Sequence, residues 1–254
     1  MKSERQQIIL DLLQESQAVT VKDISDTLGV SDMTIRRDLS EMADKGLITR
    51  VHGGAQLPHS TRGSSLLRLR SHAEKRLRSM EQKRSIARAA AKMIASGDTV
   101  FMGGGTTVEL ICDYLPKADI RVITNSMPVL NLLADNPHVE LFLLGGTLHQ
   151  DTRVFTSPFG NRCINDLAAN KAFVSATGVF GNEVFGSQPD VAALLSDACS
   201  QATESYLLLD GNKVGVRDFI SFTTLEKMTA VLVNADADQA AIDTLRAHTE
   251  VLIA

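Results

Sequence analysis

The sequence lacks any apolar run that approaches the ~20 residues needed for a membrane-spanning helix. Its first residues, MKSERQQ, are charged and polar and include no hydrophobic segment typical of a secretory signal. Cysteine is scarce as well: Cys112, Cys163 and Cys199 are odd in number, widely spaced and form no CxxC pair. That pattern favours buried, reduced thiols over disulfides or metal ligands. These absences predict a cytoplasmic protein that has neither a membrane partner nor a metal site.

Length and composition indicate a soluble protein with two domains. A chain of 254 residues is long enough to bury two cores, and 44% hydrophobic with 22% charged residues is usual for globular proteins. The formal net charge of −4 is distributed unevenly. Residues 1–60 carry 7 basic and 9 acidic side chains, residues 61–85 carry 8 and 2, and the remainder carries 11 and 19. A basic connector therefore precedes an acidic C-terminal region.

Residues 31–42 have the pattern of an amphipathic helix with a charged outer face. Ser31 is suited to cap this helix, because its hydroxyl can accept a hydrogen bond from a first-turn amide. Ile35, Leu39 and Met42 follow at helical spacing and form one apolar face. The opposite face carries Met33, Arg37 and Ser40, flanked by Thr34 and Arg36.

The outer face of this helix suits the major groove of DNA. Arginine can bond guanine in bidentate fashion, and a threonine methyl can contact the methyl group of thymine. We therefore predict that Arg37 and Thr34 contact bases and that Arg36 contacts phosphate, with an exchange of roles between the two arginines left open. The alternative for an isolated arginine pair is a solvated charged face.

The neighbouring segments favour DNA binding. Residues 5–13 have helical apolar spacing, a second helix begins at Thr20 or Val21, and Gly29 ends it and turns the chain. After the third helix, residues 47–52 alternate inward and outward before a glycine pair, as in a short hairpin. Together these segments make a winged helix-turn-helix. The residues predicted to contact double-stranded operator DNA are Ser31, Met33, Thr34, Arg36, Arg37, Ser40, Arg50, His52 and Gly53, although an ordinary turn histidine is the alternative for His52.

A linker and a basic connector follow. Residues 56–65, QLPHSTRGSS, contain proline, glycine and serine without periodicity, which predicts a linker. The basic stretch then runs into a helical pattern over residues 84–95, either a phosphate-contacting or dimer-forming connector or a solvated helix face. We predict a DNA-binding domain (1–56), a linker and basic connector (57–80), and an effector-binding and oligomerisation domain (81–254).

Beyond Gly97, apolar strands alternate with helices. Helices are predicted over residues 106–115, 128–134, 189–204 and 238–247, and strands over residues 99–102, 120–124, 139–144, 171–177, 205–210, 230–234 and 249–253. This rhythm predicts an α/β domain with a parallel sheet covered on both faces. In such sheets ligands bind at the carboxyl ends of the strands, so the residues that follow each strand are the candidates.

Four strand ends carry glycines, hydroxyls, amides and cations. Gly103–Thr107 joins a strand to a helix, and its amides together with the helix dipole suit a phosphate, with a plain tight turn as the alternative. It is neither a P-loop nor a GxGxxG dinucleotide turn, and no cofactor is predicted. Lys213 is expected to meet a phosphate or sugar oxygen, and His149 and Arg153 a sugar hydroxyl and a phosphate, unless His149 is an ordinary loop residue. The candidate effector residues are Gly103, Gly104, Gly105, Thr106, Thr107, Asn125, Ser126, Gly145, Gly146, His149, Arg153, Asp210 and Lys213.

Residues 30–39, VSDMTIRRDL, and residues 46–55, GLITRVHGGA, resemble the DeoR family of bacterial sugar-metabolism repressors. The C-terminal region is similar to the effector domain of that family, a relative of the ribose-5-phosphate isomerase and glucosamine-6-phosphate deaminase folds. The matching residues there are Gly104–Thr107, Thr124–Ser126, Leu144–Gly146, and Asp210 with Lys213 and Gly215. The resemblance covers nearly the whole chain and implies that a phosphorylated sugar releases the protein from its operator. Residues 105–110, GTTVEL, resemble the branch that includes lactose/tagatose phosphotransferase repressors.

Two positions depart from the family pattern. Asn212 stands where the family often has a serine before the lysine. Residues 188–191, QPDV, offer Asp190 as the only nearby acid where the family tends to have a glutamate. Both positions touch the expected pocket, and they leave the identity of the sugar open.

Three hypotheses follow. The first is a repressor, without enzymatic activity, that senses a sugar phosphate; because its head is not basic, we expect a homo-oligomer (dimer or tetramer) whose paired heads supply the affinity. The second is a sugar-phosphate isomerase-like enzyme fused to a DNA-binding head. It needs a positioned base, and Asp151, Asp190 and Asp210 are candidates without an evident acid/base partner. The third, an architectural DNA binder without an effector, leaves the polar strand ends unexplained.

Overall fold

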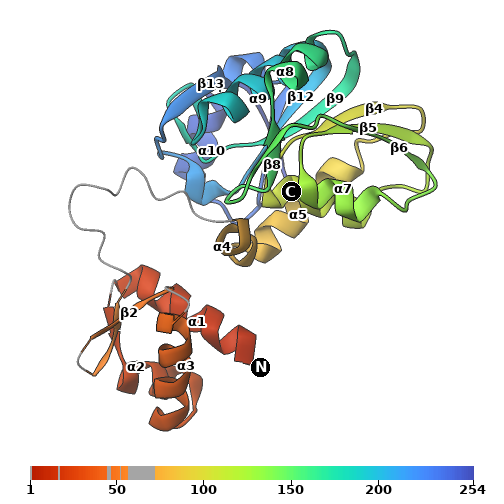
Figure 1. Ribbon diagram of the computed structural model, residues 1–254. Helices are drawn as coiled ribbons and strands as arrows, with labels where there is room; N and C mark the ends of the chain where they lie inside the picture. Colours follow the sequence, from red (N-terminus) through yellow and green to blue (C-terminus); the bar gives the residue numbers. More distant parts are fainter. Residues whose placement is uncertain (1, 17, 45–46, 52, 57–71) are drawn as a thin grey trace. The chain divides into compact units, whose positions relative to one another are not determined.

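The structure is a computed structural model that describes residues 2–16, 18–44, 47–51, 53–56 and 72–254 (Figure 1). The chain folds into two compact units, residues 1–68 and residues 69–254. Among the helices that the structure describes, none is both long enough and apolar enough to cross a membrane.

The first unit is a helix-turn-helix with a small antiparallel sheet of strand order β1-β3-β2 (Figure 1). The hairpin β2–β3 is the wing, so the predicted winged helix-turn-helix fold is confirmed. Strand β1 is not among the predicted elements, because three residues are too few to give an alternating pattern. The elements of this unit are α1 (Lys2–Ser16), β1 (Ala18–Thr20), α2 (Val21–Leu28), α3 (Asp32–Asp44), β2 (Thr49–Val51) and β3 (Gly54–Gln56).

Helix α2 is bounded by signals that the sequence carries. Thr20 and Asp23 form a capping box, in which the Asp23 amide donates to Thr20 Oγ1 at 3.1 Å and the Thr20 amide donates to Asp23 Oδ2 at 3.3 Å. Gly29 ends the helix with φ +63°, a left-handed conformation that glycine adopts without strain. The three helices pack through side chains that are fully buried: Ile9, Leu13, Ile24, Ile35, Leu39 and Met42.

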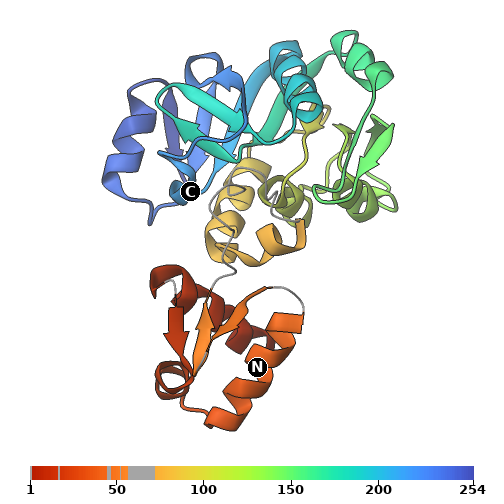
Figure 2. The ribbon, with the colours of Figure 1, turned by 60° about the vertical axis from the view of Figure 1, so that its left-hand side comes forward.

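The second unit is built on a seven-stranded parallel sheet of order β15-β14-β12-β9-β4-β5-β6 (Figures 1 and 2). Its strands are β4 (Thr99–Met102), β5 (Ile120–Thr124), β6 (Val139–Leu143), β9 (Ala169–Ser175), β12 (Ala202–Leu209), β14 (Ala230–Val233) and β15 (Glu250–Ile253). One face packs against α5 (Met80–Ala91), α6 (Thr106–Glu109), the 3-10 helix η1 (Leu110–Tyr114) and α7 (Met127–Leu133). The other packs against α8 (Pro158–Asn165), α9 (Pro189–Gln201) and α10 (Gln239–Arg246). The predicted α/β domain with a covered parallel sheet is confirmed.

Smaller elements surround this sheet. They are α4 (His72–Leu77), the hairpin of β7 (Thr147–His149) and β8 (Val154–Thr156), the antiparallel sheet of β10 (Gly178–Phe180), β11 (Glu183–Gly186) and β13 (Ile220–Thr224), and the 3-10 helices η2 (Gly211–Lys213) and η3 (Leu225–Lys227). The short strands and α8 are not predicted. Strands of three residues show no alternating pattern, and α8 has a proline, a glycine and two asparagines among its eight residues.

Three predicted helices have different bounds in the structure. Helix α5 begins at Met80 and ends at Ala91 rather than spanning residues 84–95, because the hydrogen bonds shift to three-residue spacing after Ala91. Residues 202–204 belong to β12 and not to the helix before it, because they pair with β9. The predicted helix over residues 106–115 consists of the four-residue α6 followed by η1.

Candidate functional site

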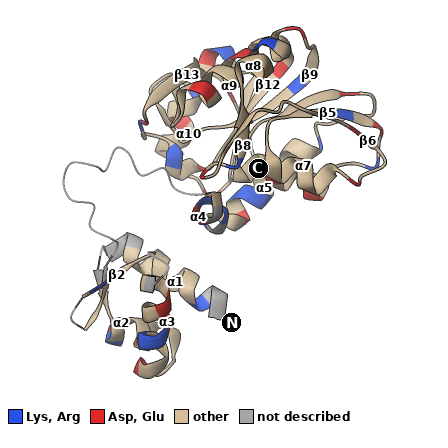
Figure 3. Cartoon of the chain, in the orientation of Figure 1, with Lys and Arg blue, Asp and Glu red and all other residues tan. Residues whose placement is uncertain are grey.

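The outer face of α3 exposes the residues assigned to DNA contacts. Arg36 and Arg37 are exposed and Met33 is 75% exposed, whereas the opposite, apolar face is buried. Figure 3 marks the charged residues of this helix. Ser31 Oγ lies 3.0 Å from Thr34 Oγ1 and accepts a hydrogen bond from the Thr34 amide at 3.4 Å. Ser31 therefore caps α3 as predicted, and it also engages the Thr34 hydroxyl.

Asp38 is a buried charged residue of α3, whereas Arg36 and Arg37 on the same helix are exposed. It is 2% exposed and accepts hydrogen bonds from Arg5 of α1 at 2.5 and 3.2 Å, which fastens α1 to α3. Among the described residues, Arg36 and Arg37 have no hydrogen-bond or ion-pair partner, so both guanidinium groups are available to an anionic partner. Sequence reasoning misses Asp38, because its partner is 33 residues away.

The wing carries two of the predicted contacts. Arg50 is exposed on β2, and Gly53 forms the turn with φ +81°. The Gly53 carbonyl accepts a hydrogen bond from the Val21 amide at 2.8 Å, which anchors the wing to α2. Ser40 is half-buried on α3, and His52 lies outside the described residues.

The carboxyl ends of β4, β5, β6 and β12 lie at one edge of the parallel sheet, with β9 between β4 and β12. Two hydrogen bonds join the segments across the end of β9. Ser175 Oγ donates to the Gly104 carbonyl at 3.2 Å, and Lys213 Nζ donates to the Ala176 carbonyl at 2.9 Å. The structure therefore brings Lys213 and the glycine turn after β4 to the same edge. Sequence reasoning misses Ser175 and Ala176, because the strand predicted over residues 171–177 includes both, whereas β9 ends at Ser175.

The turn Gly103–Thr107 is tightly packed. A Cβ atom at Gly104 would lie 2.1 Å from Val154 Cγ1, so close packing explains a glycine there. Thr106 and Thr107 are buried and begin α6. Because α6 has only four residues, its dipole is smaller than that of the predicted helix. An anion at this turn would therefore depend on the backbone amides together with the hydroxyls of Thr106 and Thr107.

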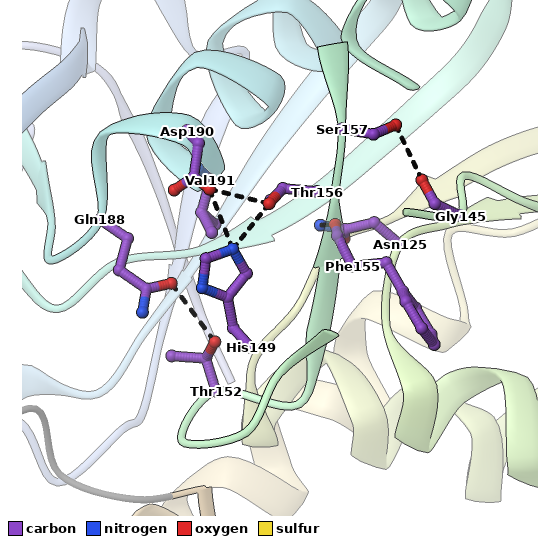
Figure 4. A network of polar contacts seen from close by, with 10 residues as sticks. All are labelled: Asn125, Gly145, His149, Thr152, Phe155, Thr156, Ser157, Gln188, Asp190 and Val191. Carbon is purple, nitrogen blue, oxygen red and sulfur yellow. Dashed lines mark hydrogen bonds and ion pairs between the residues drawn. The ribbon is translucent and has the colours of Figure 1, made fainter. Parts of the chain in front are cut away.

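Asn125 supplies a buried acceptor beyond the end of β5. Its Nδ2 donates to the Phe155 carbonyl at 3.1 Å, which fixes the orientation of the side-chain amide (Figure 4). Its Oδ1 is buried and has no hydrogen-bond partner among the described residues. Ser126 has a structural contact instead: its hydroxyl accepts a hydrogen bond from the Val129 amide at 3.4 Å and caps α7.

A network of polar side chains holds the hairpin β7–β8 against the start of α9 (Figure 4). His149 Nε2 lies 2.6 Å from Thr156 Oγ1 and 2.9 Å from Asp190 Oδ2, and Thr156 Oγ1 donates to Asp190 Oδ2 at 2.8 Å. Burial raises the pKa of Asp190, but the hydrogen bond from Thr156 and the nearby His149 outweigh it and hold this pKa below its ordinary value. The structure thus gives Asp190 a histidine partner that the sequence does not reveal.

Two other predicted effector segments, around Arg153 and at Gly145–Gly146, form hydrogen bonds with residues of the second unit itself. Arg153 has φ +58°, and its guanidinium donates to Gln150 Oε1 at 2.9 Å and to Met127 Sδ at 3.1 Å. The side chain therefore lies along the start of α7. Gly145–Gly146 follows β6, and the Gly145 carbonyl accepts a hydrogen bond from Ser157 Oγ at 3.0 Å.

Asp210 and Lys213 follow β12 with 3.6 Å between Oδ2 and Nζ, and Asp210 is buried. Lys83 of α5, which is not among the predicted site residues, is 3% exposed and donates to the carbonyls of Lys75 and Arg78. Burial, helped by the charge of Lys213 and opposed by that of Asp210, lowers the pKa of Lys83 to about 8. The sequence does carry a signal for Lys83, because it shares a helical face with buried apolar residues.

Other features lie away from this edge. A surface hollow of about 450 Å³ opens at the opposite edge of the sheet, beside Asp119 and Arg121. Cys112, Cys163 and Cys199 are free and partly buried, and burial raises the pKa of Cys112 and Cys199 to about 12. In the part of the chain that the structure describes, no group of three or more histidine, cysteine or acidic side chains could hold a metal ion.

Both units match families of known proteins. Residues 5–61 match the DeoR-like helix-turn-helix domain, and residues 78–235 match the DeoR C terminal sensor domain. Two similar relatives carry the name lactose phosphotransferase system repressor. That of Streptococcus mutans is 36% identical over 253 residues, and that of Staphylococcus aureus (strain N315) is 37% identical over 253 residues, with 99% of both chains covered in each case.

Likenesses to solved structures are weak, as one example shows. Ribose 5-phosphate isomerase A of Methanocaldococcus jannaschii aligns with 54% of this chain and 55% of its own, at 17% identity and a TM-score of 0.38.

Proposed function

This chain belongs to the DeoR family, and from that premise we propose that it is a transcriptional repressor of a sugar-utilisation operon. In this proposal α3 and the wing bind double-stranded operator DNA. A phosphorylated sugar binds the sensor unit, the second unit of the chain, at the carboxyl ends of its strands and releases the protein from the operator.

The exposed arginines of α3 support the DNA-binding part. Arg36 and Arg37 project from a helix that is fixed to its core by Asp38, so they can be presented to a groove without rearrangement. Guanidinium groups suit both guanine edges and phosphates. The names of the relatives from Streptococcus mutans and Staphylococcus aureus, both repressors of a lactose phosphotransferase system, support a sugar operon as the target.

The polar residues at the carboxyl ends of the parallel strands support the binding of a phosphorylated sugar to the sensor unit. A phosphorylated sugar offers hydroxyl donors and an anion. Asn125 Oδ1, which has no hydrogen-bond partner among the described residues, is an acceptor for a hydroxyl. Lys213, about a quarter exposed, is a cation at the same edge of the sheet, with β4 and β9 between the two strands that these residues follow. This combination of a buried acceptor with a lysine is the observation on which the proposal depends.

The test replaces Thr106 and Thr107, at the start of α6, with valine. The wild type should lose operator affinity, by roughly 5- to 150-fold, when a hexose 6-phosphate (galactose, glucose or fructose) is added, whereas inorganic phosphate alone should act weakly. The double variant should bind operator DNA as the wild type does but resist release. Fluorescence anisotropy of labelled operator measures both quantities. Thr244→Val, on the exposed surface of α10, is the matched control.

A double variant that is released at the same concentration of hexose phosphate would place the phosphate elsewhere. The isomerase alternative has one observation in its favour, the pairing of His149 with Asp190. That pair already holds the hairpin through Thr156, which favours a structural use. Turnover of aldose and ketose phosphates by the purified protein would restore the enzyme hypothesis.

A further inference from the structure

Helix α4 is the first described element after residues 57–71, which connect the two units along the chain. It belongs to the sensor unit and is followed by Ser79, with φ +49°, and then by α5. Among the contacts of α4 with the described residues, three come from different parts of the sensor unit.

The first contact is an ion pair with α6. Glu109, whose side chain is 6% exposed, lies 2.8 Å from His72 Nε2 through Oε2 and 3.7 Å from Arg76 Nη2 through Oε1. A buried carboxylate that loses its partners is left with an uncompensated charge, so moving α4 away from Glu109 would be costly. Glu109 ends the four-residue helix that Thr106 and Thr107 begin.

The second contact is made by Lys83, whose ammonium donates to the carbonyls of Lys75 and Arg78 and so ties the end of α4 to α5. Lys213 and Asp210 are close enough for their charges to act on the pKa of Lys83. A phosphate bound beside Lys213 would add negative charge to this group.

The third contact joins α4 to the hairpin β7–β8. The His72 amide donates to the Asp151 carbonyl, at the tip of the hairpin, at 2.6 Å. The same hairpin carries His149, which is bonded to Asp190 (Figure 4). A ligand that engages His149 would therefore act on a segment that already contacts α4.

We propose that α4 transmits occupancy of the sensor unit to the DNA-binding head, and that His72, Arg76 and Glu109 are the positioning residues of this coupling. The inference rests on the proposed function. A ligand can shift DNA affinity only by favouring one arrangement of the protein over another. Helix α4 has the required position, because each of these three contacts adjoins a different predicted effector segment and its own start follows the connecting residues 57–71.

Two variants remove the contact between α4 and Glu109. The first, His72→Ala with Arg76→Ala, changes only residues of α4. The second, Glu109→Gln, changes only α6 and replaces the carboxylate with an amide of the same shape. Arg84→Ala is the control, since it removes an arginine of the same basic stretch whose ion-pair partner among the described residues is the exposed Glu81. The wild type, the two variants and the control are all tested as full-length chains. The DNA is the operator located by footprinting with the wild type, and the sugars are galactose, glucose and fructose 6-phosphates.

By calorimetry, the affinity of both variants for the active hexose phosphate should be within about 3-fold of that of the wild type. In the wild type the sugar should lower operator affinity by roughly 5- to 150-fold, as expected of an allosteric protein, and in the variants by less than about 3-fold. The control should behave as the wild type. Variants that are released like the wild type, or that no longer bind the hexose phosphate, would overturn the coupling role.

A second measurement needs no sugar. Coupling is reciprocal, so operator binding by the wild type should change amide hydrogen exchange in residues 72–78 and 149–153, and the variants should lose the change in residues 149–153. Unchanged exchange in the wild-type operator complex would overturn the proposal even if a sugar phosphate is found. A wild type that binds operator but is released by none of the sugars contradicts the proposed effector instead, and the exchange result still decides the role of α4.

Discussion

Three consecutive charged residues of α3, Arg36, Arg37 and Asp38, differ in exposure. Asp38 is buried against Arg5, whereas Arg36 and Arg37 are exposed. Helical geometry accounts for this, because Asp38 is three residues after the buried Ile35 and four before the buried Met42, while Arg37 lies opposite the apolar stripe. The burial of the acid removes a negative charge from the outer face, which favours the approach of a phosphate backbone to the two arginines.

Arg37→Ala should weaken operator binding by ~1–3 kcal/mol and relax the preference at one base pair, because a guanidinium that reads a base edge contributes both affinity and discrimination. Anisotropy titrations against the operator and single-base variants measure the two effects. Arg246→Ala, an exposed arginine of α10, controls for the loss of a positive charge. An unchanged footprint and unchanged base preference would show that Arg36 or another residue reads the site.

Gly145 and Gly146 are adjacent but should tolerate substitution very differently. Gly146 has φ +146°, and a Cβ there would lie 2.3 Å from the Thr156 carbonyl oxygen, whereas a Cβ at Gly145 meets no atom within 4 Å. Gly146→Ala should therefore destabilise the sensor unit by about 1–3 kcal/mol, and Gly145→Ala by about 0.5 kcal/mol or less. Urea unfolding followed by circular dichroism compares them. Equal losses would mean that the end of β6 relaxes away from β8.

At the scale of elements, the sequence predicts what depends on local pattern. The buried strands β4, β5 and β14 are predicted because each is an apolar run bounded by turn residues, and the strand-end positions of Asn125 and Lys213 follow from parallel topology. The hairpin β7–β8, the pairing of His149 with Asp190 and the burial of Lys83 are not predicted. The hairpin strands have three residues each, too few to show an alternating pattern. The pairing of His149 with Asp190 joins segments that are distant in the sequence. The burial of Lys83 has a signal in the sequence, its place on the apolar face of α5, but a lysine is rarely buried.

The corner between α4 and α5 should give the sensor unit a characteristic pH dependence. Burial lowers the pKa of Lys83 to about 8 from an ordinary value of 10.5, so between these pH values the unfolded chain binds more protons than the folded one. Stability contributed by this site therefore rises as the pH rises from 8 towards 10.5. A neutral amine still has two N–H groups for the carbonyls of Lys75 and Arg78, so α4 can stay in place.

Thermal unfolding of the wild type and of Lys83→Met, from pH 7.5 to 10, tests this expectation. The wild type should gain midpoint temperature relative to the variant as the pH rises. Lys92→Met, an exposed lysine that follows α5, controls for removing a lysine elsewhere. A difference between wild type and Lys83→Met that stays constant with pH would mean that Lys83 keeps its charge throughout this range.

At the scale of the whole molecule, charge is separated along the chain. The first 60 residues have a balance of −2, residues 61–85 a balance of +6, and the remainder −8. DNA affinity in general depends strongly on neutralising phosphates with basic side chains. A head with a negative balance can specify a site through Arg36 and Arg37, but it has little electrostatic attraction with which to hold it.

Affinity should therefore come from pairing heads in a homo-oligomer. We expect sedimentation to find a dimer or tetramer at the concentrations used for binding, and an operator with two half-sites to bind about 10²- to 10⁴-fold more tightly than a single half-site, because the second head then binds intramolecularly. Anisotropy with the two DNA lengths, beside sedimentation velocity on the same samples, measures this. A monomer that binds one half-site as tightly as the full operator would contradict the argument. In that case the basic residues 61–85, not a second head, would have to supply the missing attraction.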